Sequence, residues 1–261
     1  NIGANKFYVN DGHKHLEEKG VEYGLDNKYK KGTDSLATSW GIAWFDYDND
    51  SHLDLFVSNG NVVLTDSLMS FADPNLLFKN NGHGGFTEVG AEEGIADIKK
   101  GRGIGLIDYD NDGDMDIVQC VVTSKQNTQS ETADDRVNFF KNNSSENGNH
   151  WIQFHLRGTT DNRNAIGSKI AIFFNGRKLI AETPSGGSSY MSQRTGIIHF
   201  GLGDATQIDR VEVTFPNGEK VVKNNLTANK RYNIIQTYRT SINEDVCYGE
   251  TYNNKYKVFK D

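Results

Sequence analysis

The chain consists of short stretches of apolar and polar residues, and none has the length or the period of a helix. Two apolar stretches, 41–45 and 103–107, run directly into acidic turns, and apolar patterns resume at 53–59 and 115–121. Residues 151–158 (WIQFHLRG) alternate with a period of two, which is typical of a half-buried strand. Asn, Asp and Gly separate the stretches, as they do between the strands of hairpins. The pattern predicts an all-β fold with no helix of useful length.

The first half contains an internal repeat. GIAWFDYDND begins at Gly41, and GIGLIDYDND begins 62 residues later, at Gly103. A flanking element is repeated as well: NKFYVNDGH begins at Asn5, NLLFKNNGH at Asn75, and a third copy begins as VNFFKNN at Val137. A repeat of about 60 residues with about four short strands predicts β-propeller blades.

This repeat predicts a blade region at residues 1–148. That region holds about two and a half blades at the observed period, whereas a closed propeller needs about four to eight. We therefore expect either further blades outside this chain or some other cover for the open strand edges, including self-assembly. The first residue is Asn1 and no leader follows, so we expect a processed, trimmed or partial chain.

The repeated segments carry two nine-residue acidic loops, Asp46–Asp54 and Asp108–Asp116. Each has carboxylates at positions 1, 3, 5 and 9, a spacing that lets a tight turn direct its oxygens to one point. Hard oxygen ligands in this number suit Ca²⁺. Gly113 permits a sharp turn at position 6 of the second loop, where the first loop has Ser51; we expect strain there if this position needs a positive φ.

Two other metal sites fit the pattern poorly. An EF-hand loop also begins DxDxDG, but it needs flanking helices and a bidentate Glu at position 12, where this chain has Val57 and Gln119. A transition-metal site at His52 is disfavoured because the surrounding ligands are hard carboxylates.

Charge and cysteine content narrow the function classes. The formal net charge is −7, which disfavours a nucleic-acid partner. Nine of the 35 acidic residues lie in the two loops, and this clustering favours a bound cation. No apolar run reaches membrane-spanning length, so we expect no transmembrane segment. Cys120 and Cys247 are too few for a disulfide framework or a zinc knuckle. We expect Cys120 to be a small core residue.

A second unit follows a polar linker at 142–149. The dipeptide Asn175-Gly176 predicts a hairpin turn between two strands, and 216–218 (PNG) predicts another turn. Strand-like stretches continue to about residue 236. We expect a compact β-sandwich.

The acidic loops resemble the calcium loops of FG-GAP/VCBS repeats, the integrin-type propeller blades. The resemblance implies side-chain ligands at positions 1, 3, 5 and 9 and a backbone carbonyl at position 7. On this chain the implied metal ligands are Asp46, Asp48, Asp50, His52, Asp54, Asp108, Asp110, Asp112, Asp114 and Asp116, of which His52 and Asp114 act through their carbonyls.

The second half resembles the ASPIC/UnbV domain. The matching motifs are 162–167 (NRNAIG), 200–203 (FGLG), 211–213 (VEV) and 215–218 (FPNG), with Phe215 where the family usually has Trp. The order of the two modules resembles that of the cartilage acidic protein-like family of secreted bacterial proteins. This implies an ASPIC/UnbV-like β domain at 149–238.

Residues 239–261 are expected to begin a further C-terminal module or tail. The motif around Cys247 (CYGETY) resembles the opening of short β-modules in large secreted Bacteroidota proteins. That resemblance implies a partner cysteine for Cys247 beyond Asp261, and a secreted or cell-surface location.

Two loop segments of the second half leave alternatives. Arg163 is a candidate ligand-binding arginine, but a structural arginine that holds its loop is favoured. Residues 185–189 (SGGSS) resemble a small-anion nest, but no helix follows them, so a plain flexible loop is favoured.

No motif indicates catalysis: the sequence has no G-x-S-x-G, HExxH, CxxC or phosphate-binding GxxxxGK[ST]. We predict a non-enzymatic, secreted, calcium-binding adhesion or protein-interaction module with a protein or glycan partner. One alternative is a structural subunit of an extracellular surface assembly or filament. Another is a secreted enzyme acting on a polymer or natural product, which would need a deep pocket with perturbed titratable groups apart from the calcium loops.

Overall fold

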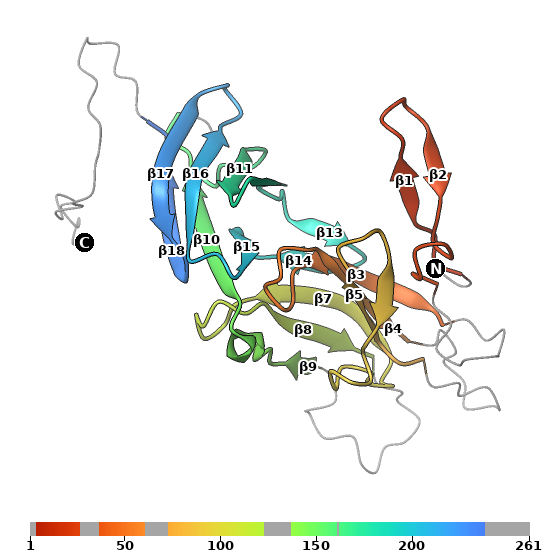
Figure 1. Cartoon of the computed structure of the whole chain (residues 1–261). Helices are drawn as coiled ribbons and strands as arrows, with labels where there is room; N and C mark the ends of the chain where they lie inside the picture. Colours follow the sequence, from red (N-terminus) through yellow and green to blue (C-terminus); the bar gives the residue numbers. More distant parts are fainter. Residues whose placement is uncertain (1–3, 27–36, 61–72, 123–136, 161, 238–261) are drawn as a thin grey trace, which may run out of the picture.

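The computed structural model describes residues 4–26, 37–60, 73–122, 137–160 and 162–237 (Figure 1). Regular structure there is β apart from one 3-10 turn, Ser144–Asn147, which confirms the all-β expectation. Within these ranges no helix is long and apolar enough to cross a membrane. The expected C-terminal module at 239–261, with Cys247, lies outside the described residues.

The strands of the first unit occur where the repeats predict them. They are β1 (Tyr8–Asn10), β2 (Leu16–Glu18), β3 (Ser39–Phe45), β4 (Asp54–Asn59), β5 (Leu76–Asn80), β6 (Phe86–Glu88), β7 (Gly101–Ile107), β8 (Asp116–Val121) and β9 (Val137–Phe140). The two copies share one antiparallel order, β3-β4-β5-β6 and β7-β8-β9. In the part of the chain that is described, these sheets stay open and do not close into a ring.

The two sheets of the first unit pack face to face around one core. Phe45 and Phe56 of the first sheet meet Ile104, Leu106 and Ile117 of the second. All six residues of β4 are buried, because the N-terminal flank covers the opposite face of its sheet. The β1–β2 hairpin extends beyond that covered face (Figure 1).

The second unit is built from two sheets around a separate core, as the sandwich expectation requires. Its strands are β10 (His150–Arg157), β11 (Lys169–Phe174), β12 (Arg177–Glu182), β13 (Gly187–Ser189), β14 (Ser192–Arg194), β15 (Ile197–Gly203), β16 (Gln207–Thr214), β17 (Lys220–Thr227) and β18 (Lys230–Ile235). Sheet β15-β10-β18 faces sheet β12-β11-β16-β17. The hairpin turn is confirmed: Asn175 has φ 46° and Gly176 has φ 72°, the left-handed pair of a type I′ turn.

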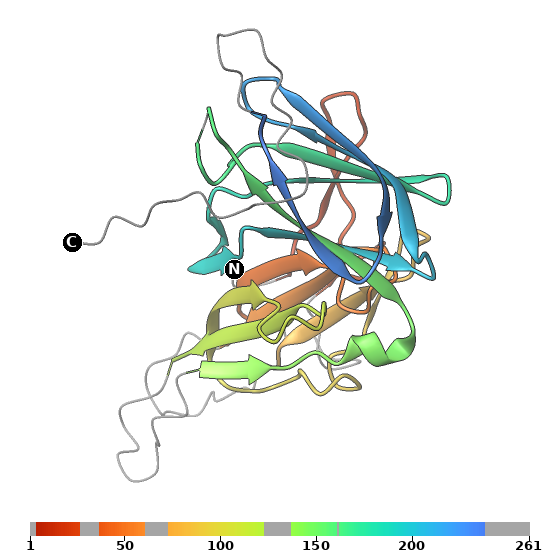
Figure 2. The same ribbon diagram turned by 90° about the vertical axis from the view of Figure 1, so that its left-hand side faces the viewer.

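The segment expected to be a flexible loop, 185–189, instead contains β13, and the β13–β14 hairpin joins the sheet of the first unit. Strand β14 pairs with β7 in parallel. The Ser189 hydroxyl donates to the Ile42 carbonyl and accepts from the Ile42 N–H, each at 2.9 Å. The Ser192 hydroxyl accepts from the Ile104 N–H at 3.0 Å. The small polar residues satisfy backbone groups of the neighbouring strands, and the hairpin thereby ties the units together (Figure 2).

The expectation that Cys120 is a core residue is wrong, because this side chain is exposed. Alternation along β8 turns Gln119 inward and Cys120 outward. The buried Gln119 amide donates to Ser58 Oγ and to Asn75 Oδ1, each at 2.7 Å. Gln119, whose polar groups are hydrogen-bonded, is thus the buried residue, whereas the apolar pattern predicts that its neighbour Cys120 is buried.

Candidate metal centres at the acidic loops

Each acidic loop connects two antiparallel strands, β3 to β4 and β7 to β8, and both have the same backbone shape. Position 4 is left-handed in both: φ is 60° at Asn49 and 61° at Asn111. Position 6 is also left-handed, with φ 73° at Ser51 and 97° at Gly113. The condition for the expected strain is therefore met, because position 6 has a positive φ and Ser51 adopts a conformation that non-glycine residues rarely take.

Three carboxylates converge in each loop. One oxygen from each member of a group lies within 4.8 Å of the others, and the groups are Asp46, Asp48 and Asp50 in the first loop and Asp108, Asp110 and Asp116 in the second. Such groups could hold a metal ion. All six are among the residues that the sequence nominates.

The last carboxylate of each loop closes the turn. Asp54 accepts the Tyr47 N–H at 3.0 Å and the Asn80 N–H at 2.7 Å. Asp116 makes the equivalent bonds to the N–H groups of Tyr109, at 3.1 Å, and of Asn142, at 2.8 Å. These bonds tie the two ends of each loop to the flanking repeat that follows it.

The side chains at position 7 form hydrogen bonds with other residues of the acidic loops. His52 Nδ1 lies 3.0 Å from Asp50 Oδ1. The carboxylate of Asp114 is fully buried and accepts a bond from Asn49 Nδ2 at 2.9 Å. The carbonyls of His52 and Asp114, rather than these side chains, remain the predicted metal ligands.

We expect Asp112→Ala to lower the melting temperature in calcium more than His52→Ala. Asp112 supplies a predicted ligand and also accepts the Asp114 N–H at 2.9 Å, whereas His52 offers the ion only its carbonyl, which alanine keeps. Differential scanning fluorimetry of both variants with saturating calcium measures the difference. Equal losses would contradict this ligand assignment.

The first loop concentrates negative charge in a buried position. Burial, and then the charges of Asp54, Asp50 and Asp48, raise the pKa of Asp46 well above its usual value. Burial also raises the pKa of Asp54 to about 7. Lys79 of β5 forms an ion pair with Asp48. A single lysine against four carboxylates leaves an excess of negative charge.

The second loop has an equivalent lysine. Lys141 Nζ lies 2.7 Å from Asp110 Oδ2, and this bond lowers the pKa of Asp110. Burial raises the pKa values of Asp112 and Asp116. Lys79 and Lys141 occupy the same repeat position (FKN), so each loop receives its one lysine from the flanking repeat that follows it; Lys79 lies in β5 and Lys141 directly after β9.

A buried carboxylate oxygen tests whether the second loop fits a cation. Asp108 is only 8% exposed, and its Oδ2 accepts bonds from Gln153 Nε2 at 2.8 Å and Arg231 Nη2 at 3.1 Å. Its Oδ1 has no hydrogen-bond partner among the described residues. Since an unsatisfied buried carboxylate oxygen is costly, and Asp108 belongs to the converging group, the loop fits a hard divalent cation.

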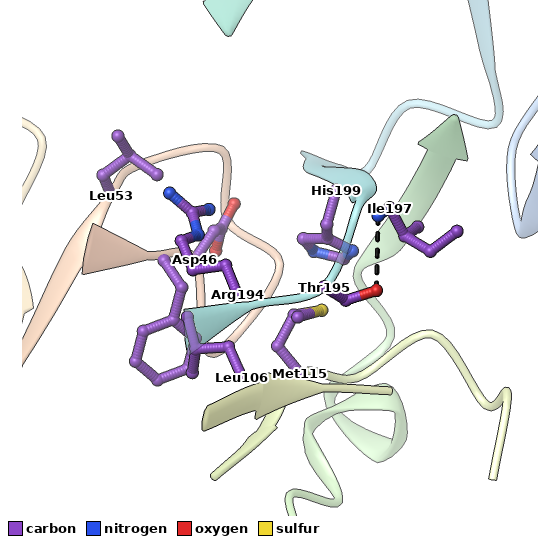
Figure 3. A pocket seen from close by; sticks show the side chains of 9 residues that line it. Asp46, Leu53, Leu106, Met115, Arg194, Thr195, Ile197 and His199 are labelled. Atoms are coloured by element: carbon purple, nitrogen blue, oxygen red, sulfur yellow. Dashed lines mark hydrogen bonds between the residues drawn. The ribbon is translucent and has the colours of Figure 1, made fainter. Parts of the chain in front are cut away.

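The first loop lies against β15 of the second unit. The Asn49 carbonyl accepts the Gly203 N–H at 2.8 Å, and Asn49 Oδ1 lies 2.9 Å from His199 Nε2. Burial and the charge of Arg194 lower the pKa of His199 to about 3, so the ring is neutral and donates from Nε2. His199 and Arg194 line a small cavity together with Asp46 (Figure 3).

The expected linker at 142–149 also contacts the first loop. The amides of Asn147 and Asn149 both donate to the Asp48 carbonyl at 2.8 Å, and the hydroxyl of Ser144 donates to the Tyr47 carbonyl at 2.6 Å. These bonds hold the polar segment against the first loop. Gln153 and Arg231 of the second unit contact the second loop, so both acidic loops lie at the junction between the units.

Sequence reasoning missed four residues at this junction. Asn49 was detectable, because DYDND repeats with Asn at a fixed position. Gln153, His199 and Arg231 come from distant strands, and no local signal marks them. The candidate ligand Arg163 is exposed; its loop is instead fixed by Asn162, whose side-chain oxygen accepts the Ile166 N–H at 2.6 Å.

Comparisons with known proteins identify the domain family of the second unit. Residues 158–241 match the family model described as ASPIC and UnbV, which confirms the resemblance seen in the motifs. The chain is 28% identical over 183 residues to cartilage acidic protein 1 of Homo sapiens, covering 69% of this chain and 25% of that protein. The Mus musculus protein of the same name is 28% identical over 180 residues, 67% of this chain and 25% of the relative.

A third match has a higher sequence identity over a shorter stretch. Cartilage acidic protein 1 of Xenopus tropicalis is 35% identical over 104 residues, 40% of this chain and 13% of that protein. The chain thus spans about a quarter of the human and mouse relatives and less of the frog one. The second unit carries an ASPIC and UnbV domain, and 69% of the chain is homologous to part of cartilage acidic protein 1.

Proposed function

We propose that the chain is a secreted, non-catalytic calcium-binding module in which FG-GAP/VCBS-type propeller blades precede the ASPIC and UnbV domain. The observation that carries this proposal is the repeated acidic loop. Two segments 62 residues apart have the same left-handed positions, and each brings three carboxylates together. Oxygen ligands from a flexible turn suit Ca²⁺ better than the softer transition metals.

Calcium has a structural role in this proposal. The loops lie between the flanking strands and the second unit, and their carboxylates carry more charge than Lys79, Lys141 and Arg231 neutralise. An ion bound there would relieve repulsion only in the folded state and would therefore stabilise the fold. Three described residues that line the small cavity have shifted pKa values, namely Asp46, Arg194 and His199. They belong to the first loop and to the strands β14 and β15. That placement supports a structural rather than a catalytic role.

A surface for a protein or glycan partner lies at the β13–β14 hairpin. Tyr190 is 45% exposed and packs against Trp40 with 4.9 Å between ring centroids. Arg102 lies 4.1 Å over the Trp40 ring, and Met191 at the hairpin tip is 79% exposed. Aromatic residues, Met and Arg are the types enriched at protein interfaces. The similarity to a protein whose name associates it with cartilage supports a role outside the cell.

Isothermal titration with Ca²⁺ tests the proposal directly. We expect two binding sites per chain and only one in Asp110→Asn, because this variant removes a converging carboxylate from the second loop alone. Asp11→Asn is the matched control: Asp11 accepts the His13 N–H in a turn outside both loops, and this variant should keep two sites. Absence of calcium binding, or two sites in Asp110→Asn, would reject the assignment.

A further inference from the structure

Arg231 of the second unit reaches the second acidic loop and binds three acceptors at once. Its Nη2 lies 3.1 Å from Asp108 Oδ2, its Nη1 donates to Asn111 Oδ1 at 2.8 Å, and its Nε donates to Gln153 Oε1 at 2.7 Å. Gln153 in turn donates to the same Asp108 oxygen at 2.8 Å. The planar guanidinium therefore holds Asp108 and Asn111 in one fixed geometry.

This geometry determines what Asp108 can offer to a cation. Arg231 and Gln153 both use Oδ2, so Oδ1 is the oxygen left for a further ligand, and it has no hydrogen-bond partner in the described part of the chain. Asn111 is a left-handed residue that shapes the turn, with φ 61°. Arg231 thus fixes both the direction of a converging carboxylate and the backbone that carries its neighbours.

We propose that Arg231 is a positioning residue for the cation of the second acidic loop, so that cation binding and docking of the second unit on the first stabilise each other. This inference rests on the proposed calcium binding and adds to it that the ASPIC and UnbV domain supplies part of the site's support. Residues that orient metal ligands commonly change affinity 10- to 100-fold when removed, roughly the range expected here. By linkage, a side chain that strengthens ion binding is itself held more firmly when the ion is bound.

The experiment must distinguish the effect of the positive charge of Arg231 from the effect of its hydrogen bonds, because any positive charge near a metal site also repels the ion. Arg231→Lys keeps the positive charge and loses the three-way fork, since one ammonium cannot reproduce the geometry of Nε, Nη1 and Nη2. Weaker binding in this variant therefore reports lost positioning. Arg210→Lys is the matched control: Arg210 pairs with Glu212 on β16 at 3.0 Å and contacts neither loop in the described structure.

The experiment measures each loop separately by calcium titration. In an Asp48→Asn background, which disables the first loop, Arg231→Lys is expected to raise the Kd of the second loop about tenfold or more. In an Asp110→Asn background the Kd of the first loop should change less than about twofold, and Arg210→Lys should change neither. Hydrogen exchange over residues 150–157 should slow on adding calcium, and less so in Arg231→Lys.

Each outcome decides the inference. An unchanged second-loop Kd in Arg231→Lys overturns it while leaving calcium binding intact, and equal weakening of both loops shows general loosening and also overturns it. A parent protein that binds no calcium overturns the proposed function itself. If Arg231→Lys does not fold, Asn111→Gly removes the Nη1 acceptor while tolerating the positive φ, and the same loop-specific weakening is expected.

Discussion

Removing calcium is expected to lower the melting temperature by about 10 °C at pH 8 and by much less at pH 5. A ligand at a hundredfold excess over its Kd stabilises the folded state by about 2.7 kcal/mol per site, so two sites supply about 5 kcal/mol. A domain of this size shifts its melting temperature by about 2–4 °C per kcal/mol. Both loops can therefore account for a shift of this size.

The pH dependence follows from the raised pKa values in the first loop. Asp54 has a pKa of about 7, so it holds its proton at pH 5 in the metal-free folded protein, and burial shifts the pKa of Asp46 in the same direction. Without the ion, the contribution of Asp54 to stability is complete below about pH 4, the pKa of an unfolded Asp, and is lost as the pH rises through 7. Asp46 contributes with the same sign, because its pKa is also raised. Calcium must displace any protons that these carboxyls hold before it can bind. Its affinity for the folded protein therefore rises about tenfold per pH unit for each proton displaced, and the stabilisation by calcium rises with it.

Calorimetric melts in metal-stripped and calcium-saturated buffer from pH 5 to pH 8 measure this difference. His199, whose pKa is lowered to about 3, affects both buffers equally and cancels. In Asp54→Asn, the part of the pH dependence that arises from Asp54 should disappear. A calcium-induced shift of the same size at every pH would show that these carboxyls do not bind the ion.

The second large effect is expected from Gly113→Ala, which should destabilise the protein by about 3 kcal/mol or more. A Cβ at this position would lie 1.8 Å from Cε2 of the Trp151 ring, and the backbone φ is 97°. Overpacking costs about 1–3 kcal/mol, and a left-handed non-glycine residue about 1–2 kcal/mol. Either the Trp151 ring or the second loop must move, so calcium affinity of that loop should fall as well.

Two matched variants isolate the causes. Gly148→Ala also places a side chain at positive φ, here 87°, but nothing lies within 4 Å of its Cβ, so it should show only the conformational cost. Ser51→Gly should stabilise the protein by about 0.5–1 kcal/mol, since it relieves the strained position and removes a buried hydroxyl without a hydrogen-bond partner among the described residues. Chemical denaturation of the three variants compares them. Equal losses in Gly113→Ala and Gly148→Ala would exclude a role for the Trp151 contact.

Much of the local structure could be predicted because it depends on neighbours in the chain. The alternating apolar residues of β10, the Asn175-Gly176 turn and the carboxylates of the acidic loops each act through nearby backbone geometry. The 62-residue repeat extended this reasoning, because two copies of one sequence form the same turn. The positive φ at Ser51 could be expected from Gly113 in the other copy.

Other features depended on segments that meet only in the folded chain. Cys120 is exposed because Gln119 forms hydrogen bonds to β4 and to the flank before β5. Residues 187–189 form β13 by pairing with β14, which in turn pairs with the edge of β7. Arg231 reaches Asp108 across 123 positions of sequence. The sequence alone therefore determined most of the strands and turns and the converging carboxylates of the acidic loops, which depend on spacing along the backbone. Only the tertiary structure decided what supports them, because hydrogen bonds between distant strands depend on proximity in space rather than on spacing along the chain.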